Sequence, residues 1–175
     1  LFPKAHAVAY CMMAFRIAWF KVYHPVEFYC AYFSAAPEGM DMTLLMNGKE
    51  GCKAVLDMLE NTGAKLTQKE KATSDAMQIA YEIFSRGIEI LPVDLNRSDA
   101  KLFLPEDGKI RLPFITIPGL GLSAAENIAN TMKNESIFSV DDFKLKSGIG
   151  KGVLETLREN GVLSSLPESN QLSMF

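Results

Sequence analysis

Two glycines separated by one residue stand directly before a predicted helix. Gly119 and Gly121 flank Leu120, whose side chain can point inward as an anchor. Glycine accepts backbone angles closed to other residues and leaves its N–H group uncovered. The first N–H groups of a helix have no partner inside the helix and carry partial positive charge. With Ser123 opening the helix, residues 117–128 therefore predict a small socket for a phosphate.

A second pair of glycines with the same spacing follows about 30 residues later. Gly148 and Gly150 lead into another predicted helix, which ends before Gly161. Lys151 can add a charge contact to a phosphate, although an exposed lysine without this role is the alternative. A single glycine pair is typical of an ordinary helix–helix turn. Two pairs at this distance resemble tandem helix-hairpin-helix modules, which bind the DNA backbone without reading its sequence and stack around a pseudo-two-fold axis.

The elements around the two turns are predicted from local patterns. The helix after the first turn runs to about Lys133, with Ala124, Ala125 and Ile128 facing inward. Ser139 begins a further helix, and Asp141 and Asp142 in its first turn are typical of a helix cap. Upstream, residues 88–94, 101–104 and 109–112 form short strand-like runs, with a hairpin turn at residues 105–108. This small sheet is expected to support the turns that follow it.

The first half of the chain is predicted to be helical. Residues 5–23 are apolar almost all round, but Arg16 near the centre argues against a membrane span. We expect a helix buried in a larger protein, with Trp19 and the methionines in the core. A second helix covers residues 26–34, and a third covers residues 49–61 with Val55, Met58 and Leu59 on its apolar face. The capping-box pattern of Thr67 and Glu70 opens a fourth, which ends at Arg86.

The composition narrows the class of protein. The 175 residues allow one large domain or two small ones. The three widely spaced cysteines fit free thiols in a reducing cytoplasm, and no signal peptide is visible. The net charge is −3, and residues 101–163 hold as many acidic as basic side chains. Contact with DNA there must therefore depend on backbone N–H groups and a few lysines. Because the chain begins with Leu1 in the middle of an apparent helix, we expect a piece of a larger protein.

Five stretches, in order, resemble one protein family. They are residues 1–10, 16–21 and 93–98, the first glycine turn, and the last five residues. Together they are similar to the C-terminal end of PolC-type DNA polymerase III alpha subunits, the replicative polymerases of low-GC Gram-positive bacteria. The resemblance covers the whole chain, and its first and last stretches are the most specific.

The resemblance implies a mostly α fold with a small β element. Residues 1–88 correspond to the end of the polymerase fingers. Residues 89–163 correspond to a duplex-binding domain with two helix-hairpin-helix motifs, and residues 164–175 to a flexible tail. The phosphate-contact candidates are Gly119, Leu120, Gly121, Ser123, Gly148, Gly150 and Lys151. Within the whole enzyme, this part would bind duplex DNA during template-directed synthesis at the replication fork in the cytoplasm.

The last five residues are similar to a sliding-clamp-binding peptide. In that family, a glutamine and two apolar anchors fill a pocket on the clamp. The corresponding residues are Gln171, Leu172, Ser173, Met174 and Phe175. Met174 replaces the more usual leucine, a swap of similar volume. The alternative is that these apolar side chains fold back onto the domain.

The resemblance also locates the chemistry that this chain lacks. The palm of such polymerases carries the carboxylates that hold Mg²⁺ for nucleotidyl transfer. No Asp-x-Asp pair in a strand occurs here, so we expect no catalytic residue in this segment and no activity of it alone. The candidates for contacts with the incoming dNTP or the template are Lys4, His6, Tyr10 and Arg16. A capped helix start, a core tyrosine and a structural ion pair are the alternatives for these residues.

Two other classes of protein compete with the polymerase interpretation. A non-catalytic helix-hairpin-helix module of a DNA repair nuclease or ligase explains the turns, but neither the first helix nor the terminal peptide. A pure protein-interaction domain predicts no salt-dependent DNA binding.

Overall fold

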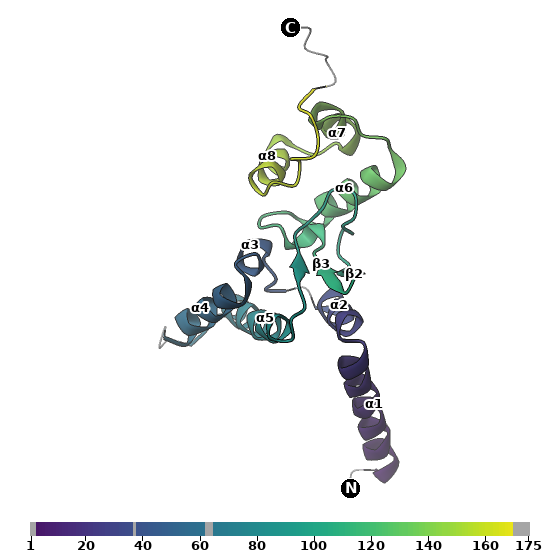
Figure 1. The fold of residues 1–175 in the computed structure, drawn as a ribbon, viewed down its shortest axis with the longest axis vertical. Helices are drawn as coiled ribbons and strands as arrows, with labels where there is room; N and C mark the ends of the chain where they lie inside the picture. Colours follow the sequence, from purple (N-terminus) through teal and green to yellow (C-terminus); the bar gives the residue numbers. More distant parts are fainter. Residues whose placement is uncertain (1–2, 37, 62–64, 170–175) are drawn as a thin grey trace.

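The computed structural model describes residues 3–36, 38–61 and 65–169. In chain order its helices are α1 (Lys4–Tyr23), α2 (Pro25–Ala35), α3 (Met42–Leu45), α4 (Gly48–Asn61), α5 (Gln68–Ser85), the 3-10 helix η1 (Phe114–Thr116), α6 (Leu122–Asn134), α7 (Val140–Ser147) and α8 (Lys151–Glu159). The strands are β1 (Ile90–Leu91), β2 (Leu104–Glu106) and β3 (Lys109–Arg111). The predicted fold class, mostly α with a small β element, is confirmed (Figure 1).

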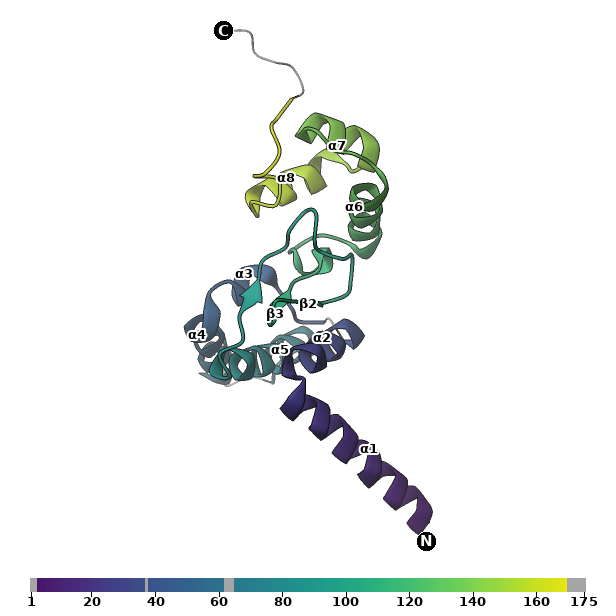
Figure 2. The same ribbon diagram turned by 45° about the vertical axis from the view of Figure 1, so that its right-hand side comes forward.

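Helix α1 extends away from the rest of the molecule (Figure 2). None of its described side chains is buried, and Trp19 is 49% exposed. Within this chain the expected core position is wrong for Trp19, Met12 and Met13, which are exposed, and right for Met42 and Met77, which are buried. The side chains of α1 are exposed because, within the described ranges, only its last turns contact other elements of the chain. The rest of the helix is apolar on all sides but has no neighbour in the described part of the chain to bury it. Among the described residues, no helix has the length and apolar character needed to cross a bilayer.

Helices α2, α4 and α5 follow their local signals. Pro25 occupies the first position of α2, which tolerates a residue without an N–H group. The capping box of α5 is present, because the Thr67 hydroxyl accepts from the Glu70 amide at 3.3 Å and the Glu70 carboxylate accepts from the Thr67 amide at 2.7 Å. On α4, Leu59 is buried as predicted, but Met58 is 63% exposed.

The three strands form a small mixed sheet with the order β1-β3-β2. Strand β1 runs parallel to β3, and β2 pairs antiparallel with β3. The predicted hairpin is present, with its turn at Asp107 and Gly108, both of which have positive φ. The strand predicted from Lys101 begins only at Leu104. The reason is that the Asp99 carboxylate accepts the amides of residues 101 and 102 and turns the chain there.

A buried arginine fixes the hairpin to the preceding loop. Arg111 is 8% exposed and donates to both carboxylate oxygens of Glu106, at 2.8 and 2.7 Å, and to the carbonyl of Pro92 at 2.7 Å. Arg97 donates to the same carboxylate at 2.6 Å. These hydrogen bonds, first of all those from Arg111, lower the pKa of Glu106 to about 2.

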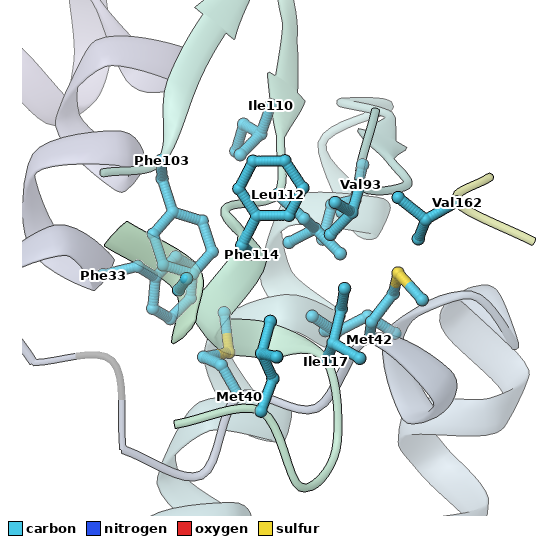
Figure 3. Packing of buried hydrophobic residues seen from close by; sticks show 14 of the residues in the cluster. Phe33, Met40, Met42, Val93, Phe103, Ile110, Leu112, Phe114, Ile117 and Val162 are labelled. Carbon is cyan, nitrogen blue, oxygen red and sulfur yellow. The ribbon is translucent and has the colours of Figure 1, made fainter. Parts of the chain in front are cut away.

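The core runs from α2 through the sheet to α8. Its members include Phe33 and Phe103, whose ring centroids lie 5.4 Å apart, and Phe114, which is fully buried (Figure 3). Because Ile117 belongs to this cluster, the first glycine turn begins on a buried anchor. The sheet region supports the turn, as the sequence predicted.

Candidate nucleic-acid interface

The first hairpin links η1 to α6. Ile117 is 1% exposed, and its carbonyl accepts the amide of Leu120 at 3.1 Å, which closes the turn. Gly119 has φ +78°, an angle that favours glycine. Leu120 is 6% exposed, so the predicted inward anchor is confirmed. Gly121 is the N-cap residue of α6, with φ −77° and ψ 156°.

The second hairpin links α7 to α8, and its two glycines have backbone angles similar to those of the first. Gly148 has φ +63°, and its amide donates to the carbonyl of Lys144 at 3.2 Å. Ile149 is 7% exposed, like Leu120 in the first hairpin. Gly150 is the N-cap residue of α8, with φ −70° and ψ 163°.

The repeat extends from the turns into the helices that follow them. Adding 29 to the number of each residue in the first hairpin gives its counterpart in the second. Ala125 and Ile128 of α6 are fully buried, and their counterparts Leu154 and Leu157 of α8 are buried too. Two segments with similar glycine backbone angles, the same buried anchor and the same buried helix face are two copies of one structural unit, although different hydrogen bonds close the two turns.

Both copies leave the start of a helix open. Neither Gly121 nor Gly150 supplies a side-chain cap, and both are exposed. The first amides of a helix have no partner inside it and attract anions. A Cβ atom built on either glycine meets nothing within 4 Å. Because neither packing nor the backbone angle requires glycine at these two positions, what glycine provides there is an unobstructed row of N–H groups.

The two hairpins differ in the side chain that follows the N-cap glycine. In the second it is Lys151, exposed and without an ion pair among the described residues. In the first it is Leu122, 42% exposed. Helix α6 thus begins one residue earlier than predicted, and Ser123 lies exposed in its first turn rather than opening it. The second hairpin offers charge as well as amides, whereas the first offers amides and the Ser123 hydroxyl.

Some of the charged groups near the hairpins are paired within the fold. Lys146 donates to Asp142 at 3.0 Å and to the carbonyl of Ser136 at 2.7 Å, which lowers the pKa of Asp142. Arg158 donates to Glu168 at 2.6 Å. Asp142 also accepts the amide of Phe138 at 3.1 Å, and the Ser139 hydroxyl accepts the amide of Asp142 at 3.2 Å. The predicted cap at the start of α7 is therefore present.

The first part of the predicted tail is hydrogen-bonded to the start of α7. The amides of Val140 and Asp141 donate to the carbonyls of Pro167 and Glu168, at 2.9 and 3.2 Å. These amides belong to the first turn of α7, so the tail satisfies groups that the helix cannot. The clamp-peptide candidates Gln171, Leu172, Ser173, Met174 and Phe175 lie outside the described residues.

The nucleotide-contact candidates lie on α1, far from both hairpins (Figures 1 and 2). Lys4, His6, Tyr10 and Arg16 are all exposed. The rings of His6 and Tyr10 meet edge to face with centroids 4.4 Å apart, so these two share a face as predicted. Tyr10 is 66% exposed, and among the described residues Arg16 has no ion pair. The structure thus does not join the α1 candidates and the hairpins into one site.

Sequence reasoning missed two ionic groups that shape these surfaces. One is the pair of Glu106 and Arg111 on the two strands of the predicted hairpin, where Lys109 rather than Arg111 stands directly opposite Glu106. The other is the ion pair between Lys21 of α1 and Glu82 of α5, which lie 61 residues apart in the sequence. No local sequence pattern predicts a contact between them. Within the described ranges, no group of three or more His, Cys, Asp or Glu side chains is placed to hold a metal ion.

Comparison with known proteins gives two results. A family model described as a helix-hairpin-helix motif matches residues 87–172, which include both hairpins. Over all 175 residues, the chain is 42% identical to the protein named DNA polymerase III PolC-type of Caldanaerobacter subterraneus subsp. tengcongensis. It is 43% identical to the protein of that name from Thermotoga maritima and 41% identical to that of Clostridium perfringens. The chain spans only 12–13% of the length of these relatives.

Proposed function

Since the chain belongs to the family of PolC-type DNA polymerase III, we propose that it is the part of a replicative DNA polymerase that holds duplex DNA by its backbone. The observation that carries this proposal is the repeated hairpin. Two copies of one turn each present the open amides of a helix start, at Gly121 and Gly150. Such amides bind phosphate oxygens and carry no information about the bases.

The charge distribution sets the expected strength of this contact. Residues 101–163 have no net charge, and two of the basic groups near the hairpins, Lys146 and Arg158, are already paired. Lys151 is the cation best placed to neutralise a phosphate, directly after an N-cap glycine. We therefore expect binding by this chain alone to be modest and only weakly dependent on salt.

We assign α1 to the nucleotide side of the polymerase. Lys4 and Arg16 are exposed cations that suit triphosphate charge, and the exposed Tyr10 ring suits stacking on a base. The exposed apolar surface of α1 fits a helix that the remainder of the polymerase covers. In this assignment residues 1–88 end the fingers, and residues 89–163 form the duplex-binding domain. The Mg²⁺ ions for nucleotidyl transfer are then bound by carboxylates outside this segment.

We further propose that residues 171–175 bind the sliding clamp and so tether the polymerase during synthesis. The attachment of the chain to α7 through Pro167 and Glu168 supports this, because it fixes where the terminal peptide leaves the domain. Apolar anchors on a short extended peptide suit a pocket on a partner. Binding of the chain to a purified bacterial clamp, lost on deletion of residues 171–175, is the expected result. Equal binding by both forms contradicts the assignment.

The DNA-binding role is tested by fluorescence anisotropy with two duplexes of unrelated sequence across a range of salt concentrations. We expect equal affinity for both duplexes. Lys151→Ala should lower the affinity and reduce the slope of log affinity against log salt by about one. The matched control is Lys109→Ala in β3, which lies outside both hairpins. It should change neither the affinity nor the slope. Strong preference for one duplex, or an unchanged slope in Lys151→Ala, contradicts the proposal.

The same measurement separates DNA binding from a pure protein-interaction role, and the clamp-binding experiment separates a polymerase part from a repair module. A protein-interaction domain would bind neither duplex. A repair module would bind DNA but would not need a clamp peptide or a fingers helix. The relatives match from the first helix to the last residue, which favours the polymerase.

A further inference from the structure

Packing alone does not fix the direction of helix α1. It has no buried side chain among its described residues, and the elbow where it meets α2 carries an open apolar groove of about 470 Å³. Ile17 and Phe20 of α1 line this groove together with Phe28 of α2, so apolar side chains at the elbow stay open to solvent. A helix of 20 residues is about 30 Å long. A tilt of about 10° at the elbow would move its far end by about 5 Å.

A cluster of charged groups joins the last turn of α1 to the last turn of α5. The Nζ atom of Lys21 lies 2.9 Å from Oε2 of Glu82. The other carboxylate oxygen of Glu82 lies 2.9 Å from Nη2 of Arg86 and accepts from its Nε atom at 3.0 Å. Glu82 thus holds one cation from α1 and one from the end of its own helix.

Arg86 also contacts the backbone of α1 directly. Its Nη1 atom donates to the carbonyl of Lys21 at 3.3 Å. This carbonyl belongs to the last turn of α1, where carbonyls lack partners inside the helix and attract cations. Arg86 thus satisfies one of the last carbonyls of α1, which ends at Tyr23.

An aromatic surface from α2 supports the two cations. The Lys21 Nζ atom lies 5.7 Å from the ring centroid of Phe28 and 5.8 Å from that of Tyr29. The Arg86 guanidinium carbon lies 5.9 Å from the ring centroid of Tyr29, which is itself 1% exposed. Burial and the nearby Glu82 carboxylate raise the pKa of Tyr29 to about 12, so its ring stays neutral. Elements α1, α2 and α5 thus meet in one cluster.

We propose that Glu82 is a positioning residue that sets the direction of α1 by holding Lys21 and Arg86 together. The consequence for function rests on the nucleotide role proposed above. If Lys4, His6 and Tyr10 contact the nucleotide or template, Glu82 controls their position indirectly. It holds the last turn of α1, and these residues lie toward the other end of the same helix. Each contact in the cluster is half-exposed and individually weak. Loss of all these contacts together should lower the population of the α1 direction seen in this structure by about five-fold.

The direction of α1 can be measured by pulsed electron spin resonance between two spin labels on the chain. Cys11 on α1 is exposed and accepts one label, and Lys53→Cys on α4 provides the second. Cys30 and Cys52 are buried, and burial raises the pKa of both thiols, so they should stay unlabelled. Dilution with unlabelled chain removes distances between molecules.

We expect Glu82→Gln to broaden the distance distribution while helix content is unchanged. Lys21→Met should do the same, and the double variant should add little, because both changes break one cluster. Glu89→Gln, which removes another exposed pair with Lys109, is the matched control and should leave the distribution as it is. An unchanged distribution in folded Glu82→Gln overturns the proposal.

Kinetics of the whole polymerase test the consequence separately. Glu82→Gln should raise the nucleotide KM about five-fold with little change in kcat, because it misplaces a binding surface without touching the reacting atoms. A broadened distribution with an unchanged KM supports the positioning of α1 by Glu82 and overturns its link to nucleotide binding. The two readouts therefore distinguish failure of this inference from failure of the proposed function.

Discussion

At the scale of single residues, the N-cap glycines are the strongest indication that the hairpins bind an anion. Gly121 and Gly150 have backbone angles that any residue accepts and open space around a Cβ atom. Serine is among the preferred N-cap residues, because its hydroxyl accepts one of the open amides. A protein built for stability alone would have serine at these positions. Glycine there leaves the amides available to another acceptor.

This reasoning predicts opposite effects on stability and binding. Gly121→Ser and Gly150→Ser should each stabilise the chain by a few tenths of a kcal/mol or leave it unchanged. Each should weaken binding to duplex DNA about five-fold, because the serine occupies an amide that the phosphate would use. Thermal unfolding and anisotropy on the same samples measure both effects.

Gly119→Ser provides the contrast within the same hairpin. Gly119 has φ +78°, so a side chain there should cost about 1–2 kcal/mol of stability through backbone strain. If the N-cap serine variants bind DNA as well as the unchanged chain does, the amides of the helix starts are not the contact.

A second residue-level prediction concerns Glu106, whose pKa is lowered to about 2 by Arg111 and Arg97. A carboxylate whose pKa is lower in the folded state stabilises the fold above its ordinary pKa, and this contribution is lost as the pH falls through the folded value. Glu106→Gln should therefore be less stable than the unchanged chain at neutral pH. The gap should shrink between about pH 4.5 and pH 2. Urea unfolding across this range measures it, and a gap that stays constant with pH argues against the ionic contribution.

At the scale of elements, the contact between the tail and α7 separates two roles of the end of the chain. Deleting residues 170–175 removes the clamp-peptide candidates but leaves the carbonyls that accept from Val140 and Asp141. Deleting residues 164–175 removes both. The longer deletion should lose about 2 kcal/mol of stability from two uncapped amides, and the shorter one should lose none.

Clamp binding should respond differently from stability to the two deletions. Both truncated chains should lose it, although only one is destabilised. Surface plasmon resonance with immobilised clamp, combined with unfolding curves, gives the two readouts. Equal stability of both truncated chains would show that the contact with α7 contributes nothing to the fold.

Elements with strong local signals were predictable from the sequence. The capping box at Thr67 and the two glycine turns each depend on a few adjacent residues. Contacts between distant segments were not predictable in this way. The parallel pairing of β1 with β3 and the ion pair between Lys21 and Glu82 join residues with no shared local pattern. The exposure of Trp19 was missed for a related reason, because side-chain type predicts a need for burial but not which segment provides it.

At the scale of the whole molecule, α1 is the least supported part. Its exposed side chains include Phe15, which is 78% exposed, Trp19 and Phe20. Exposed apolar surface of this extent favours association. We expect the chain to self-associate in solution and to become monomeric when residues 1–20 are removed, which spares Lys21 and its partners. Sedimentation velocity checks this, and a monomeric intact chain would contradict it. An unchanged unfolding temperature of the shortened chain is the control for the fold.

The two proposed surfaces lie at opposite ends of the molecule. Helices α6, α7 and α8, which the hairpins precede or join, lie on one side of the sheet, and α1 extends from the other side (Figure 1). This separation suits a segment that holds duplex DNA at one place and contributes to the nucleotide site at another. It also means that the two roles can be tested independently, since changes in the hairpins should not move α1.

The central claim is that both hairpins hold duplex DNA through the amides at their helix starts. Its most direct test follows the backbone amide resonances of the isotope-labelled chain while short duplex DNA is added. We predict that the resonances of residues 121–124 and 150–153 shift together and over the same range of DNA concentration. Shifts confined to one hairpin, or confined to residues outside both, would contradict the claim.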